Sequence, residues 1–110
     1  MRNQKSIERN LQLYKQVKAA WVTHLIGVIS ILVRSIGLSY DEETKTISLH
    51  VIFESPPNED EVNLYEDAEA EFISELRGEY LTYLDLQIIS NDPIEQPNWG
   101  FIFKRLEKDK

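Results

Sequence analysis

Histidines and carboxylates are the side chains of this 110-residue chain that could do acid–base or metal chemistry. The chain has 19 acidic residues, two histidines and no cysteine, so disulfides and thiolate sites are excluded. His24 falls on the apolar side of an expected helix, and we interpret it as a core or boundary histidine. His50 falls on the polar face of an expected strand. It could pair with a carboxylate there, but we favour an exposed strand histidine.

The spacing of these residues matches no catalytic or metal-binding motif. The sequence has no phosphate-binding glycine loop, no nucleophile elbow and no zinc-protease helix signature. The spaced ligands of a calcium-binding EF-hand loop are also missing. We therefore expect no catalytic residue, no metal site and no cofactor. An enzyme or small-ligand-binding domain is an alternative, and it would need a pocket with converging polar groups near His50 or Asp85.

The densest group of carboxylates lies on a helix expected over about residues 59–77. Asn58 can cap its first turn, and Gly78 can end it in the left-handed conformation. One face carries five acidic residues: Glu66, Asp67, Glu69, Glu71 and Glu75. Like charges four residues apart repel one another by a few tenths of a kcal/mol. This face is either a solvated surface or a partner-binding surface for a cationic protein.

Charge is distributed unevenly along the chain. Residues 41–79 hold thirteen acidic and two basic side chains, residues 1–40 hold six basic and one acidic, and the net charge is −7. A net acidic surface repels nucleic acid, which we do not expect as a partner. The basic first helix could neutralise the acidic one within the molecule. Three further carboxylates could form the rim of the partner-binding surface: Asp41, Glu42 and Glu43.

Apolar residues at helical spacing predict a long helix over about residues 4–35, ended by Gly37. The β-branched run from Val28 to Ile31 makes a strand possible in its second half. A helix of that length would project from a small domain and would need a partner. The alternative function is therefore a structural or assembly subunit, a homodimer formed through Leu11, Tyr14, Trp21 and Leu25.

Four strands complete the expected fold. Alternating apolar and polar residues predict them at Leu38–Asp41, Thr46–Glu54, Tyr80–Ser90 and Trp99–Leu106. The element order α-β-β-α-β-β suggests a single α+β domain over residues 1–110. Two hairpins would form a four-stranded antiparallel sheet, with both helices packed on one face.

The longest apolar run, Leu25–Val33, is too short to span a bilayer, and we find no secretory signal pattern in the first residues. The lack of cysteine also suits a reducing compartment. We therefore expect a cytoplasmic protein that makes no membrane contact.

Two stretches resemble small acidic immunity proteins of bacterial toxin systems. One is Ile52-Phe53-Glu54-Ser55-Pro56-Pro57-Asn58-Glu59-Asp60-Glu61, which enters the acidic helix. The other is the terminal Gly100-Phe101-Ile102-Phe103-Lys104-Arg105. The resemblance covers size, acidity and the layout of the second half. It implies a non-enzymatic inhibitor that neutralises a cognate, often cationic, toxin by plugging its active site, and it assigns no site residue.

Overall fold

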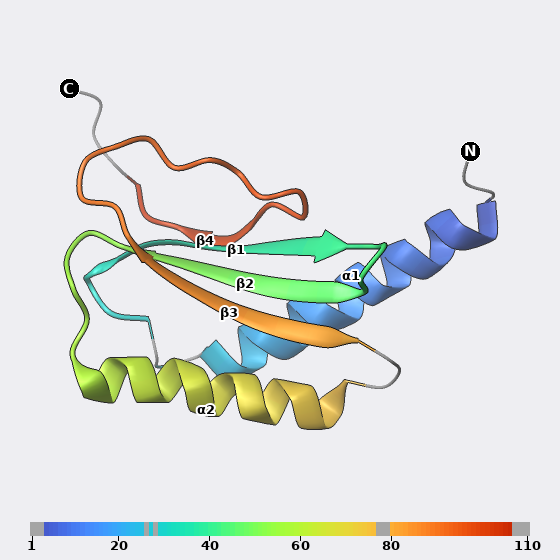
Figure 1. Ribbon diagram of the computed structural model, residues 1–110, viewed down its shortest axis with the longest axis horizontal. Helices are drawn as coiled ribbons and strands as arrows, with labels where there is room; N and C mark the ends of the chain where they lie inside the picture. Colours follow the sequence, from blue (N-terminus) through green and yellow to red (C-terminus); the bar gives the residue numbers. More distant parts are fainter. Residues whose placement is uncertain (1–3, 26, 28, 77–79, 107–110) are drawn as a thin grey trace.

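The computed structural model describes residues 4–25, 27, 29–76 and 80–106, with side chains from Leu11 onward. The elements are α1 (Gln4–Leu25), β1 (Val33–Asp41), β2 (Thr46–Phe53), α2 (Glu59–Glu75), β3 (Leu81–Ile88) and β4 (Phe101–Lys104). Figure 1 shows one sheet with α2 along its lower side and α1 behind it. The predicted α+β class is confirmed.

The sheet is mixed, with the strand order β3-β2-β1-β4, so the prediction of an antiparallel sheet is wrong. β1 pairs antiparallel with β2 and with β4, but β2 and β3 are parallel. The reason is that α2 connects β2 to β3, and a helical crossover returns the chain in the same direction. The predicted hairpin of the last two strands does not form, because β3 and β4 lie at opposite edges of the sheet (Figure 1).

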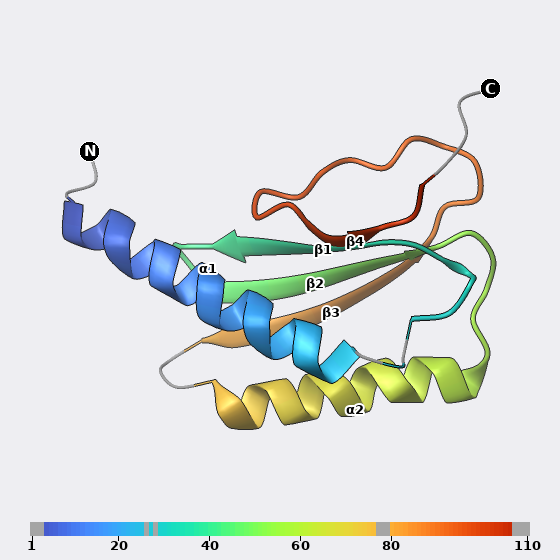
Figure 2. The ribbon, with the colours of Figure 1, turned by 180° about the vertical axis from the view of Figure 1, so that it is seen from behind.

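One face of the sheet and both helices enclose the core. Figure 2 shows α1 crossing this face, with α2 beside it. The indole ring of Trp21 stacks on the ring of Phe72, with centroids 4.8 Å apart, and joins the two helices. The core side chains come from every layer: Leu13, Val17, Trp21, Leu25, Val33, Ile36, Leu38, Ile47, Leu49, Val51, Phe53, Tyr65, Ala68 and Phe72. Within the described residues, no helix has the length and apolar character that crossing a membrane requires.

The first helix ends at Leu25, so the prediction of a helix to residue 35 is wrong. Gly27 adopts a φ of +85°, a left-handed conformation that glycine tolerates and that a helix does not contain. The apolar residues that follow belong to β1, and Gly37 lies inside that strand rather than at a helix end. A β-carbon on Gly37 would lie 2.5 Å from Cγ of Pro97, because the segment 89–100 passes directly over the strand there.

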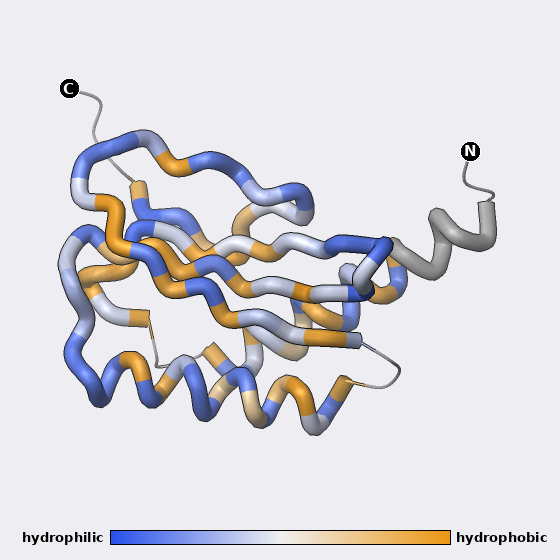
Figure 3. Tube along the Cα trace, viewed as in Figure 1, coloured by the Kyte–Doolittle hydropathy of each residue, from blue (hydrophilic) through white to orange (hydrophobic). Residues whose placement is uncertain are grey.

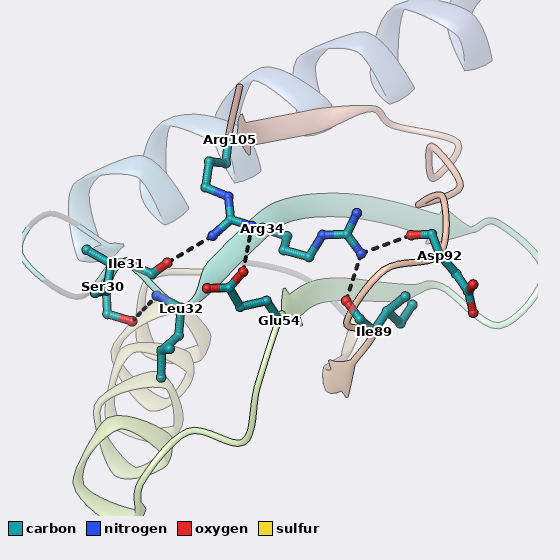
Figure 4. Close-up of polar contacts among 8 residues, drawn as sticks. All are labelled: Ser30, Ile31, Leu32, Arg34, Glu54, Ile89, Asp92 and Arg105. Atoms are coloured by element: carbon teal, nitrogen blue, oxygen red, sulfur yellow. Dashed lines mark hydrogen bonds and ion pairs between the residues drawn. The ribbon is translucent and has the colours of Figure 1, made fainter. Parts of the chain in front are cut away.

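Two arginines fasten the loops around the end of the sheet (Figure 4). Arg34 is buried, and its Nη1 donates to the carbonyl oxygens of Ile89 at 2.7 Å and Asp92 at 2.9 Å. Arg105 donates to the carbonyl oxygen of Ile31 and, through Nη2, to the carboxylate of Glu54, both at 3.0 Å. These contacts fix the chain as it leaves β3 and as it enters β1.

The start of α2 is held by the predicted cap. The side chain of Asn58 accepts a hydrogen bond from the backbone N–H of Glu61 at 2.7 Å. The carboxylate of Glu61 is nearly buried and accepts from the hydroxyl of Ser30. The helix is thus tied to the α1–β1 connection at its first turn. The predicted end of the helix at Gly78 lies outside the described residues.

Candidate functional site

The acidic face of α2 comprises Glu66, Asp67, Glu69, Glu71 and Glu75, which lie on the sides of the helix that do not point into the core. Tyr65, Ala68 and Phe72 point into the core, while the carboxylates face solvent, with Glu69 half-buried. In Figure 3, hydrophilic and hydrophobic residues recur in turn along α2. The acidic face divides into two halves that differ in their contacts.

The C-terminal half of this face is bridged to α1. Nδ1 of His24 lies 2.9 Å from a carboxylate oxygen of Glu71. Nε2 of His24 lies 3.0 Å from a carboxylate oxygen of Glu75, close enough for an ion pair but without the alignment of a hydrogen bond. The side chain of His24 is only 11% exposed. His24 is therefore a boundary histidine, as predicted, and it joins the two helices.

The N-terminal half of the acidic face has no such bridge. Within the described part of the chain, Glu66, Asp67 and Glu69 form no ion pair. Lys15 and Lys18 of α1 are exposed, and the ammonium of Lys18 lies over the ring of Tyr14 rather than beside these acids. Among the described side chains, His24 is the one basic group of α1 that pairs with carboxylates of α2.

Beside this half runs a groove of about 380 Å³ between α2 and β3. Glu66 and Glu69 form its acidic wall. The opposite wall consists of β3 side chains: Thr82, Tyr83, Leu84 and Leu86. The carboxylates of α2 and the edge strand of the sheet therefore form one continuous surface.

Two of the four residues predicted for self-association are buried within the chain itself. Trp21 and Leu25 are each 2% exposed and belong to the core, so they cannot form an interface between copies. Tyr14 is half-buried, and its ring packs edge-to-face with the ring of Trp99, with centroids 5.3 Å apart. Leu11 is 51% exposed. The apolar stripe of α1 covers the sheet, and a homodimer through Leu11 and Tyr14 stays a prediction.

The other face of the sheet carries a row of hydrogen-bonded polar side chains. Oγ of Ser39 lies 2.6 Å from Nε2 of His50, and Nδ1 of His50 lies 2.8 Å from the carboxylate of Asp85. The amide of Gln87 donates to the same carboxylate. The parallel register places His50 directly beside Asp85. The interpretation of His50 as an exposed, unpaired histidine is therefore wrong.

This polar row forms part of a cleft of about 610 Å³ beneath the segment 89–101. A serine, a histidine and an aspartate in this order could activate the serine as a nucleophile. Acyl transfer also needs donors for the oxyanion, and these usually supply the largest share of the catalysis. The neighbouring N–H groups are already used, because Leu38 N donates to Gly100 O and Tyr40 N donates to Asn98 Oδ1. The row is better explained as a set of bonds that joins three strands.

The predicted rim lies at the turn between β1 and β2. The carboxylate of Asp41 accepts hydrogen bonds from the backbone N–H groups of Glu43 and Thr44 and so shapes the turn. Burial raises the pKa of Tyr40 in this region, and the phenol of Tyr80 and the carboxylate of Glu42 raise it further. A role of Asp41, Glu42 and Glu43 in partner binding stays a prediction. Among the described residues, no cluster of three potential metal-binding side chains forms.

Comparison with known proteins completes the description of the chain. No curated protein matches it. The sequence model of the MafI2 immunity protein matches residues 14–107. This match covers α2, all four strands and the second half of α1. It agrees with the resemblance to toxin-immunity proteins seen in the sequence. The chain belongs to the MafI2 immunity protein family.

Proposed function

We propose that this protein neutralises a cationic toxin by binding it, without catalysis, through the acidic face of α2. Membership of an immunity protein family supports a toxin as the partner. The observation that carries the choice of surface is the N-terminal half of the acidic face, where Glu66, Asp67 and Glu69 have no ion-pair partner within the described chain. No ion pair among the described residues relieves the repulsion between these like charges.

A cationic partner would remove this repulsion on binding. Opposite charges on two surfaces accelerate encounter and disfavour wrong partners, and this effect weakens as salt screens the charges. An inhibitor must bind its toxin before the toxin reaches its target, so fast association is useful. The net charge of −7 of the whole chain adds a long-range attraction for a cationic partner.

The first experiment identifies the partner. The protein is used as bait in lysate of its native host at low and at high salt, and the eluates are identified by mass spectrometry. We expect one basic protein at low salt that is lost at high salt. Capture of only the bait itself, with a dimer mass in solution, would instead favour assembly through α1.

The second experiment tests the surface. Glu66→Lys with Asp67→Lys should weaken the affinity for the captured toxin by at least about tenfold, mainly through slower association. The matched control is Asp92→Lys with Glu95→Lys, which makes the same change in net charge on exposed residues outside α2. Equal weakening by both pairs would mean that only net charge matters, and no weakening by either would remove the acidic face from the account.

A further inference from the structure

β3 is an edge strand, and no strand of the described chain pairs with one side of its backbone. The N–H of Leu81 donates to the carbonyl oxygen of Lys45, and the N–H of Ile89 donates to that of Phe53. In a parallel pair, alternate residues direct both backbone groups to the same side. The odd-numbered residues of β3 therefore bond to β2. The even-numbered residues direct their N–H and C=O groups outward: Thr82, Leu84, Leu86 and Ile88.

Within the part of the chain that the structure describes, this edge lacks the usual protection against pairing. Natural edge strands are shielded by charged side chains, proline, bulges or a covering segment. β3 has no proline, and its one charged residue, Asp85, is bonded to His50 on the sheet face. Three large apolar side chains of β3 are instead exposed: Leu81 at 63%, Tyr83 at 58% and Ile88 at 52%. A strand with open backbone groups and exposed apolar side chains is a template for another strand.

The electrostatics along this edge select the kind of strand. Glu66 and Glu69 of α2 lie across the groove from Thr82, Leu84 and Leu86. Neither carboxylate has an ion-pair partner among the described residues. Side chains of an added strand would alternate, with every second one directed toward α2. Lysine or arginine at those positions would meet the two carboxylates.

We propose that an extended, basic segment of the toxin pairs with the outer edge of β3 and becomes a fifth strand of the sheet. This inference rests on the proposed function and specifies how the toxin is held. Backbone hydrogen bonds to the even-numbered residues provide the pairing. Glu66 and Glu69 pair with basic side chains at every second position of the added strand. Leu81 and Tyr83 pack against apolar side chains at the positions between them.

The first test uses a synthetic strand, acetyl-(Lys-Val)4-amide, with the full-length protein. Amide hydrogen exchange is followed by NMR with and without saturating peptide. The amides of Thr82, Leu84, Leu86 and Ile88 should exchange about fivefold or more slowly in the complex. The odd-numbered amides of β3, already bonded to β2, serve as the internal control and should change less. The inference would be overturned if the exchange rates of the four outward amides stayed unchanged with the lysine peptide. It would also be overturned if acetyl-(Glu-Val)4-amide slowed them equally.

A substitution tests the same pairing with the captured toxin. Thr82→Pro removes an outward N–H and no bond to β2, which edge strands tolerate. Thr82→Val removes the hydroxyl but keeps the N–H and the branched shape. The proline variant should bind at least about tenfold more weakly than the valine variant. Circular dichroism and the melting temperature establish whether both variants are folded, and the peptide exchange test decides the question if the proline variant is not.

The two proposals fail in different ways. Toxin binding that is weakened by Glu66→Lys with Asp67→Lys, but is equal for Thr82→Pro and Thr82→Val, would leave the acidic face in place and remove strand addition. Toxin binding that is insensitive to the charge reversals would contradict the proposed function itself.

Discussion

The two halves of the acidic face of α2 have the same residue types and opposite surroundings. Glu71 and Glu75 lie within 3.0 Å of the imidazole of His24, so their charges help to join the two helices. Glu66, Asp67 and Glu69 form no ion pair among the described residues, and Glu66 and Glu69 line the groove beside β3. An acidic row on a helix is therefore not one functional unit. Tertiary contacts decide which charges contribute to folding and which are left for a partner.

The largest expected effect concerns the packing beneath the bridged half. Phe72 is 1% exposed and stacks on Trp21, so Phe72→Ala should lower the free energy of unfolding by about 3–5 kcal/mol. The neighbouring Ile73 is 49% exposed, and Ile73→Ala should change the free energy of unfolding by only about 0.5 kcal/mol. Urea unfolding of both variants measures the difference. Similar losses for the two would mean that α1 and α2 do not pack as described.

A smaller effect separates the two halves by their contribution to stability. Glu71→Lys with Glu75→Lys places two cations beside His24. Since both carboxylates are more than half exposed and screened by solvent, the loss should stay below about 1 kcal/mol. Glu66→Lys with Asp67→Lys should instead raise stability by a few tenths of a kcal/mol through relief of repulsion. Thermal melts at low salt measure both, and a loss from the second pair would show that the unbridged half also supports the fold.

The smallest effect concerns Tyr65, on the buried side of the same helix. Its hydroxyl is buried and has no hydrogen-bond partner among the described residues. Tyr65→Phe should therefore change stability at pH 7 by no more than about 0.5 kcal/mol, in either direction. A fall of more than that would indicate that the hydroxyl has a partner.

Alkaline pH should reveal the same phenol more clearly. Burial, and to a lesser extent the carboxylate of Glu61, raises the pKa of Tyr65 above its ordinary value of 10. The unfolded chain loses this proton near pH 10 while the folded chain keeps it, so stability falls as the pH rises above about 10. Urea unfolding at pH 8 and at pH 10.5 should show a smaller fall for Tyr65→Phe than for the wild type. An equal fall would exclude Tyr65 as its cause.

Local patterns predicted the elements that local interactions define. Asn58 and the acidic first turn marked the start of α2, and alternation marked β2 almost to the residue. The first residues of β1, Val33–Ser35, are predicted as helix because this strand is covered on both faces, by the helices and by the segment 89–100. A strand with two buried faces loses the alternation that identifies strands and reads as a continuous apolar run.

The candidate site was predicted in its residue types but not in its contacts. The five carboxylates of α2 follow from helical spacing, since the exposed face of a helix is a local property. The bridge from His24 and the pairing of His50 with Asp85 depend on segments 35 or more residues apart. The pairing of His50 with Asp85 also requires that β2 and β3 lie side by side and parallel. The predicted sheet, with a hairpin of the last two strands, did not include this parallel pair. The open edge of β3 follows from the same topology.

The association rate of the captured toxin, measured by stopped-flow fluorescence over a range of salt concentrations, tests the central claim most directly. The wild type is compared with Glu66→Lys plus Asp67→Lys and with the control pair Asp92→Lys plus Glu95→Lys. We predict that the rate falls steeply with salt for the wild type and the control. For the reversal on α2, we predict a rate at least about tenfold lower at low salt, with a weaker salt dependence. A rate that is independent of salt, or equal in all three proteins, would contradict the account.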